Sequence, residues 1–139
     1  MNIRRIMMSL KTKAIKKSKS PDDGLRISIM SRHTLNDGIT PDKEITVDLY
    51  DAWWKELAPP DKLIGSYYKR GLSWNDFAEE FNVYLQSASV SDLLAKLIDL
   101  AKAKNVTILC VEDKPDYCHR KLVAHRCAEL DGSLEIIIE

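Results

Sequence analysis

Three adjacent side chains that can do chemistry, Cys118, His119 and Arg120, follow a polar loop and open the last predicted helix. A thiol in the first turn of a helix tends toward a lowered pKa, because unpaired N–H groups and the helix dipole favour negative charge there. His119 can exchange a proton near neutral pH, and Arg120 offers a planar fork for a phosphate or carboxylate. The three residues therefore predict a catalytic site with a thiolate, a base and an anion clamp.

The same residues also fit an anion-binding pocket that performs no chemistry, and Cys118 can equally be a packing residue. Arg32 and His33, at the end of a predicted strand, join the anion-binding set if that strand end lies on the same sheet edge as Cys118. Two interpretations stay open: a thiol-dependent enzyme with an anionic substrate, and a non-catalytic module for a phosphate-bearing ligand or nucleic acid. A partner-binding scaffold is a third interpretation.

The other two cysteines have the sequence surroundings of core residues. Cys110 lies inside an apolar run, and Cys127 shares an apolar helical stripe with Val123. Cys118 and Cys127 are nine positions apart, about half a turn out of phase on a helix, and the chain has no Cys-x-x-Cys or His-x-x-x-His pair. We therefore expect no metal and no cofactor. Cys110 and Cys118 could still approach each other across the intervening loop as a redox pair.

The elements that must position these residues predict one α/β domain over residues 1–139, with the first nine residues flexible. An N-terminal pair of strands precedes several helices, and a C-terminal strand-helix-strand unit completes a mostly parallel sheet flanked by helices. The continuous apolar run at 106–111 is typical of a strand buried on both faces. The predicted strands are 6–15, 25–30, 106–111 and 134–138, and the last predicted helix is 119–130.

Four further helices are predicted between the second strand and the buried one. The first runs from Asp48, as N-cap, to about Leu57, with Trp53 on its core stripe. The Pro59-Pro60 pair ends this helix. The other three cover 61–68, a segment that begins after Ser73, and a segment that begins at Ser91.

Charge is unevenly distributed in a chain whose net charge is zero. The first twenty residues hold seven basic residues and no acidic one, so the remainder holds fourteen basic against twenty-one acidic, a balance of minus seven. This basic arm, residues 1–20, could contact nucleic acid or phosphate. Alternatively, its lysines could protect an edge strand from pairing with another strand. No apolar run approaches the ~20 residues of a membrane helix. Three cysteines without an export signal predict free thiols and a cytoplasmic location, with no membrane partner.

The segment 108–120 resembles the C-terminal signature of the domain-of-unknown-function family 488: an apolar strand, a Cys, a Glu, then a Pro and Cys-His-Arg at a helix start. The segments 20–26, 54–59 and 71–77 resemble the short, YeaO-like branch of that family. The resemblance implies a small cytoplasmic α/β protein and supplies no reaction. The branch usually continues its second strand with Arg-x-x-Trp-Pro-Arg-Gly; here Arg32 matches the first Arg and the run continues to Gly38, but the Trp, the Pro and the second Arg are missing. A ligand contact made by the second Arg in relatives would be lost or replaced.

Overall fold

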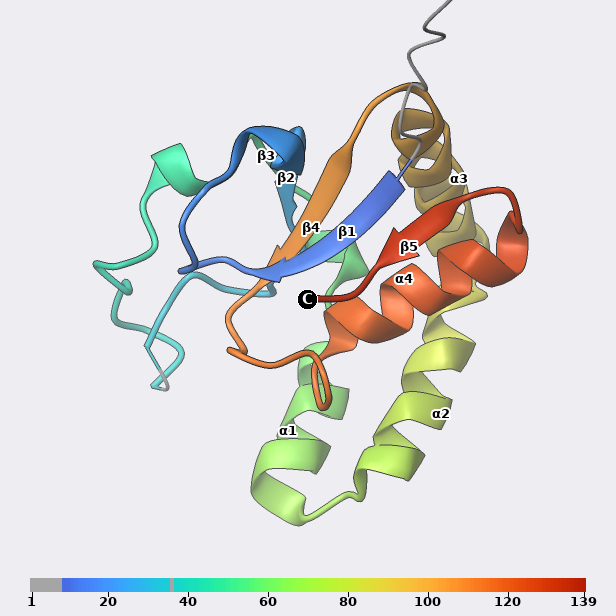
Figure 1. Ribbon diagram of the computed structural model, residues 1–139. Coiled ribbons are helices and arrows are strands. Elements are labelled where there is room, and N and C mark those ends of the chain that lie inside the picture. The colour runs from blue at the N-terminus through green and yellow to red at the C-terminus, as the bar shows by residue number, and fades with distance from the viewer. Residues whose placement is uncertain (1–8, 36) are drawn as a thin grey trace, which may run out of the picture.

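In the computed structural model, which describes residues 9–35 and 37–139, five parallel strands form one sheet flanked by helices (Figure 1). The predicted α/β fold is confirmed. Of the nine residues predicted to be flexible, 1–8 lie outside the described part of the chain, whereas Ser9 is the first residue of a strand and is buried. The strands are β1 (Ser9–Ala14), β2 (Leu25–Ser28), β3 (Ala52–Trp53), β4 (Val106–Cys110) and β5 (Glu135–Ile137). The helices are α1 (Asp61–Arg70), α2 (Trp74–Leu85), α3 (Ala88–Ala103) and α4 (His119–Leu130).

The central strand is β4, which is buried along its whole length as its apolar sequence predicts. The strand order is β3-β2-β4-β1-β5, so the two N-terminal strands pair with β4 on either side and not with each other. In the C-terminal unit, β5 pairs with β1. This order brings the ends of β2 and β4 together, and both strands lead into the candidate site.

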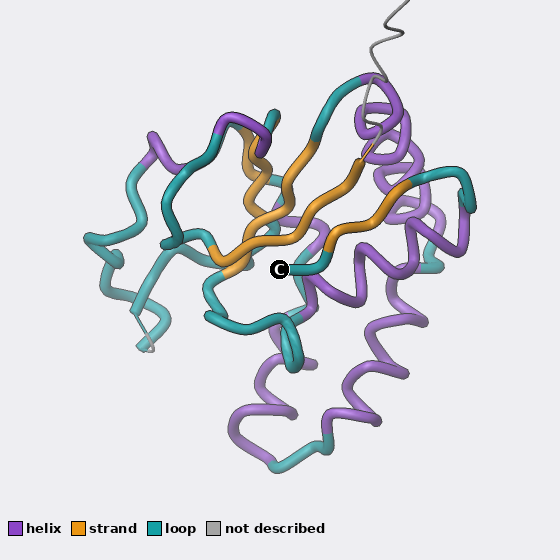
Figure 2. Tube along the Cα trace, viewed as in Figure 1, coloured by secondary structure: helices purple, strands orange, loops and turns teal. Residues whose placement is uncertain are grey.

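The two faces of the sheet differ in what covers them (Figures 1 and 2). On one face, sheet residues such as Leu10 and Ile108 join a large apolar core with residues of α2, α3 and α4. On the other face lie mainly loops and a short 3-10 turn, Pro21–Asp23. None of the described helices has the length and apolarity needed to cross a bilayer.

A buried charge cluster occupies the loop-covered face. Lys11 and Lys13, two positions apart on β1, place their ammonium groups 2.7 and 3.0 Å from the carboxylate of Asp23, and Arg26 of β2 contacts the same carboxylate. Burial favours the neutral acid, but hydrogen bonds from Lys11, the Ser20 main chain and Lys13 hold the pKa of Asp23 well below its usual range. Since β1 lies between β4 and β5, the prediction that these lysines protect an edge strand is wrong.

The predicted helix from Asp48 to Leu57 is also wrong. Two short 3-10 turns, Val47–Leu49 and Lys55–Leu57, flank the two-residue strand β3. The reason is sheet pairing: the main-chain N–H of Trp54 donates to the Ser28 oxygen at 2.8 Å. Trp53 is 41% exposed, and its indole N–H donates to the main-chain oxygen of Met30. Pairing with β2 thus overrides the helical spacing.

The two helices next along the chain follow their sequence signals. The segment predicted at 61–68 is helical as α1 and ends at Gly71, which has φ +73°. Ser73 caps α2, since its hydroxyl accepts a hydrogen bond from the Asp76 main-chain N–H at 3.1 Å. The turn between the two helices sets α1 beside α2, below the end of the sheet in Figure 1, where α1 forms a wall of the site described next.

Candidate functional site

A cavity of about 680 Å³ lies beyond the carboxyl ends of β2 and β4, with α1 and the start of α2 as its walls. This is the edge of a parallel sheet at which ligands generally bind, and the volume is that of a small-molecule site. The residues after β2, including Met30 and Arg32, line one side. Cys110, Cys118 and His119 line the part of the cavity next to β4 and α4.

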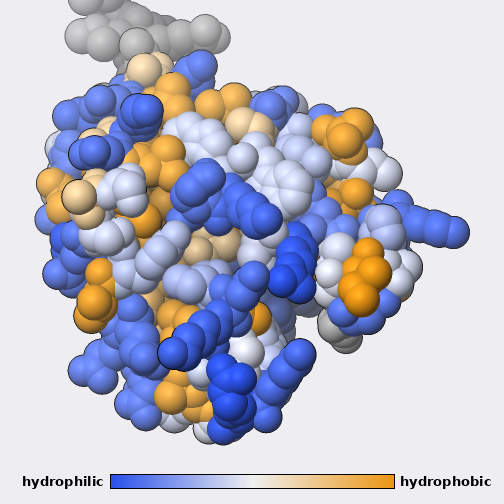
Figure 3. All heavy atoms as spheres, turned by 180° about the vertical axis from the view of Figure 1, so that it is seen from behind, coloured by the Kyte–Doolittle hydropathy of each residue, from blue (hydrophilic) through white to orange (hydrophobic). Residues whose placement is uncertain are grey.

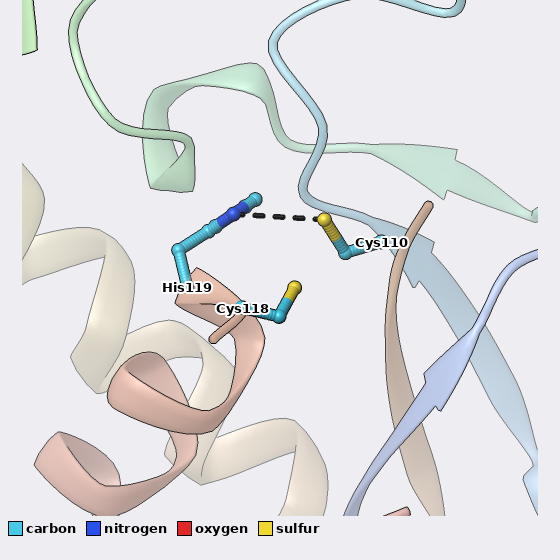
Figure 4. Close-up of side chains that lie close together, drawn as sticks. All are labelled: Cys110, Cys118 and His119. Carbon is cyan, nitrogen blue, oxygen red and sulfur yellow. Dashed lines mark hydrogen bonds between the residues drawn. The ribbon is translucent and has the colours of Figure 1, made fainter. Parts of the chain in front are cut away.

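These three side chains point toward one another (Figure 4). Cys110 is the last residue of β4, Cys118 is the N-cap of α4 and His119 is its first residue. Their ligand atoms, the two Sγ atoms and a ring nitrogen, all lie within 4.8 Å of one another. The Sγ of Cys110 lies 3.5 Å from Nδ1 of His119. Cys110 is buried, as its apolar surroundings in the sequence predict, but its thiol also lines the cavity.

The ring of His119 is held in one orientation. Its Nε2 lies 2.7 Å from the main-chain oxygen of Ile29, which can only accept a hydrogen bond. Nε2 therefore carries the proton of the neutral ring, and Nδ1 is left with a free lone pair toward Cys110. The ring edge also packs against Phe81 at 5.9 Å between centroids. His119 is thus placed to accept a proton from the Cys110 thiol.

The pKa values of the two clustered thiols are shifted in opposite directions, and the shift at Cys118 is opposite to the predicted one. A hydrogen bond from the Cys118 thiol lowers the pKa of Cys110 against the effect of burial, and the Glu112 main-chain N–H and the Arg120 charge add to the lowering. Burial raises the pKa of Cys118, and the neighbouring Cys110 raises it further. The expectation of a lowered pKa at Cys118 is therefore wrong, and Cys110 is the more acidic thiol.

Arg120 is fully buried and does not line the cavity. Its Nη1 donates to the main-chain oxygen of Glu112 at 2.6 Å, and its Nη2 lies 3.5 Å from that of Asp113. Its Nε and Nη2 donate to the main-chain oxygen of Glu139 at 3.3 and 3.2 Å. Because the guanidinium donors are used in these contacts, Arg120 stabilises the loop after β4 and does not bind an anion as predicted.

Of the second pair of predicted residues, only Arg32 reaches the cavity. Its side chain is 49% exposed at the cavity rim and lies 3.1 Å from Asp61 of α1. His33 turns away: its Nε2 lies 2.7 Å from the Ser28 hydroxyl, and its ring stacks on Trp53. Burial lowers the pKa of His33, which favours the neutral ring. His33 is therefore poorly suited to the anion-binding role predicted for it.

Helix α1 contributes cavity residues that the sequence analysis missed. Lys62, Lys69 and Arg70 line the cavity, and no carboxylate lies within 4.0 Å of these three cations in the described part of the chain. The Tyr68 hydroxyl donates to the Glu112 carboxylate at 3.0 Å across the cavity. The signal available in the sequence was the density of cations in 61–70, but only the position of α1 shows that they line the same cavity as the thiols.

A family model described as "Active DUF488-N3 subclade" matches residues 10–129. The matched stretch contains Cys110, Cys118 and His119, together with all of α1. No curated protein and no solved structure matches the chain.

Proposed function

The chain belongs to the DUF488 family, and on this premise we propose that it is a thiol-dependent enzyme that acts on a small anionic substrate, with Cys110 as nucleophile. The observation that carries the proposal is the 3.5 Å approach of His119 Nδ1 to the Cys110 sulfur within the cavity. A nucleophile in hydrogen-bond contact with a base that a third group orients is the usual arrangement of covalent catalysis. Here the main-chain oxygen of Ile29 is the orienting group. The description of the subclade as active fits an enzyme.

Each member of the cluster has a distinct task in this proposal. As the Cys110 sulfur forms a bond to the electrophilic atom of the substrate, its proton passes to Nδ1 of His119. The same nitrogen then gives the proton to the leaving group as the bond to that group breaks. Cys118 keeps its proton and donates a hydrogen bond to the Cys110 sulfur, so it is a positioning residue. The proposal thus keeps His119 from the predicted catalytic set and moves the nucleophile from Cys118 to Cys110.

The anionic character of the substrate rests on the cations around the cavity. Arg32, Lys62, Lys69 and Arg70 line it against three acidic residues, Asp37, Asp61 and Glu112, which leaves a balance of plus one. Asp61 pairs with Arg32, Glu112 accepts from Tyr68, and Asp37 accepts from Thr40. The free thiols fit the cytoplasm as the location of this enzyme.

The same cations favour one alternative, a module that binds a phosphate-bearing ligand without chemistry. The alternative requires the cavity and its cationic residues but not the thiol. It predicts that Cys110→Ser leaves ligand binding unchanged, whereas the enzyme loses turnover with that substitution. Nucleic acid is the less favoured ligand, since Lys11 and Lys13 of the basic arm are turned inward to Asp23.

The test is the rate at which iodoacetamide alkylates each cysteine of the folded protein near neutral pH in excess EDTA, read by peptide mass spectrometry. We expect Cys110 to react roughly a hundredfold faster than Cys127, which is fully buried and whose pKa burial raises to about 12. His119→Gln should slow Cys110 by about tenfold or more, because it removes the base. Cys118→Ser, which keeps a donor, should slow it less than Cys118→Ala. Equal, slow reaction of Cys110 and Cys127 would contradict a thiol enzyme.

A further inference from the structure

We propose that Cys110, Cys118 and His119 also form a binding site for a soft divalent cation of the Zn²⁺ type, and that the bound cation blocks the thiol. The site is a property of the three side chains and does not depend on the proposed function. Only its consequence, reversible inhibition, rests on Cys110 being the nucleophile.

The spacing of the ligand atoms matches tetrahedral coordination. With Zn–S near 2.3 Å and Zn–N near 2.0–2.1 Å, a tetrahedral site has an N···S edge of about 3.6 Å and an S···S edge of about 3.8 Å. His119 Nδ1 and Cys110 Sγ are 3.5 Å apart, and all three ligand atoms lie within 4.8 Å of one another. A cation can therefore be held after a small adjustment of the Cys118 side chain.

The ligand types select for a soft cation. Two thiolates and one imidazole suit Zn²⁺ and exclude hard cations such as Mg²⁺, which prefer oxygen ligands. Two thiolates would also neutralise the dipositive ion, which matters because Cys110 and Cys118 are 4% and 2% exposed. Each thiol releases its proton to solvent as its sulfur binds the cation, so a dipositive ion that enters from the cavity is fully charge-compensated by the two sulfurs.

The surroundings of the ligands are those of a prepared site. A metal-bound histidine usually donates its second ring N–H to a carbonyl, which fixes the ring and the coordinating nitrogen. The bond from Nε2 of His119 to the Ile29 oxygen already does this and leaves Nδ1 for the cation.

The fourth coordination position is open to the cavity. All three ligands line the cavity, and the described residues supply no fourth His, Cys, Asp or Glu atom within this cluster. Structural zinc sites close all four positions with protein ligands, whereas three-ligand sites leave one for water or a small molecule. We therefore infer a site that loads from the cavity and that a chelator can empty, as a reversible block of Cys110 requires.

The direct test is titration of the reduced protein with Co²⁺ as a spectroscopic probe. We expect a thiolate-to-cobalt charge-transfer band together with the visible bands of tetrahedral Co²⁺, both removed by one equivalent of Zn²⁺ and unaffected by Mg²⁺. Cys110→Ser, Cys118→Ser and His119→Gln should each weaken Co²⁺ binding by about a hundredfold or more. Cys127→Ser is the matched control, since this thiol is buried in the main core away from the cavity, and it should bind like the wild type. Circular dichroism verifies that each variant is folded.

Two readouts separate this proposal from the thiol enzyme. Alkylation of Cys110 in EDTA tests the reactive thiol, and the Co²⁺ bands test the metal site. If the bands appear and Zn²⁺ protects Cys110 from iodoacetamide until EDTA is added, the metal site is supported. A protein that shows no thiolate-to-cobalt band, or whose band survives Cys118→Ser, would overturn the three-ligand site whether or not Cys110 is reactive.

Discussion

Arg120 is the residue whose position differs most from what its type predicts. Its guanidinium joins the main-chain oxygens of Glu112 and Asp113, on the loop after β4, to that of Glu139 beside β5. A fully buried cation with several charge-assisted hydrogen bonds is costly to disturb, because the remaining oxygens lose their donors. Arg120 therefore holds the loop that carries the chain from Cys110 to Cys118, and acts on the site through that loop.

We expect Arg120→Lys to lower the free energy of unfolding by about 2–4 kcal/mol, because one ammonium group cannot reach all the oxygens that the planar fork spans. Urea unfolding followed by circular dichroism measures the change. Arg32→Lys is the control: its half-exposed pair with Asp61 should contribute less than about 1 kcal/mol. A loss at Arg120 as small as that of the control would show that the fork is dispensable and would return Arg120 to the list of ligand-binding candidates.

At the scale of single residues, the candidate site was only partly predictable from the sequence. Cys118 and His119 were identified because they follow a polar loop and begin a helix, which are local properties. Cys110 has the sequence surroundings of a core residue, and its meeting with His119 depends on how seven loop residues return to the end of β4. Spacing along α4 correctly separates Cys118 from Cys127 but carries no information on a ligand from another element. The expectation of no metal rested on that spacing and on the absence of Cys-x-x-Cys and His-x-x-x-His pairs, which are both local features of the sequence.

At the scale of elements, the junction between the 3-10 turn Pro21–Asp23 and β2 fixes the position of the strand. Gly24 has φ +62°, and a Cβ added there would lie 2.1 Å from the main-chain oxygen of Asn105. That same oxygen accepts the first hydrogen bond of β2, from the Leu25 N–H at 2.9 Å. A side chain at position 24 would therefore push β2 away from β4 at its first residue. Since Ile29 and Arg32 follow β2, the junction also supports the cavity.

Gly24→Ala and Gly71→Ala form a matched pair. Both glycines have positive φ, but an added Cβ at Gly71 meets no atom within 4 Å. We expect Gly71→Ala to cost about 1–2 kcal/mol of unfolding free energy, from conformation alone. Gly24→Ala should cost roughly 3 kcal/mol or more, because its backbone (φ +62°, ψ −133°) lies outside the left-handed helical region that Gly71 adopts, and a main-chain clash adds to that strain. Thermal or urea unfolding of the two variants side by side gives the comparison, and equal losses would mean that the strand can shift without penalty.

Elements with strong local signals were predicted and those set by pairing were not. The apolar run of β4 and the Ser73 cap of α2 are readable in the sequence because burial and capping leave local patterns. The segment 48–57 has helical spacing, yet its extended residues complete the edge of the sheet against β2. The strand order was equally hidden, because β1 and β2 are close in sequence while β4, almost eighty residues further on, inserts between them.

At the scale of the whole molecule, the basic residues near the N-terminus and those of α1 differ in their surroundings. Within the described residues, the lysines of the basic arm are largely engaged by acidic groups: Lys11 and Lys13 with Asp23, and Lys16 with Asp42 and Glu44. On the surface opposite the view of Figure 1, apolar residues form separate patches among hydrophilic ones (Figure 3). That face offers no broad apolar surface to the scaffold interpretation. The cations of α1, which pair with no carboxylate among the described residues, are instead gathered at the cavity, where they can attract an anion to the thiols.

This arrangement predicts a charge preference at Cys110 that needs no knowledge of the substrate. Iodoacetate and iodoacetamide carry out the same alkylation, but only iodoacetate is an anion. We expect the ratio of the two rates at Cys110 to exceed that of the unfolded protein by about threefold to tenfold at low salt, and to fall as ionic strength rises. Lys62→Ala combined with Lys69→Ala should lower the ratio, whereas Lys121→Ala, whose side chain lies outside the cavity lining, should leave it unchanged. A ratio equal to that of the unfolded protein would mean that the α1 cations do not act at the thiol, and the search for substrates should then turn to neutral electrophiles.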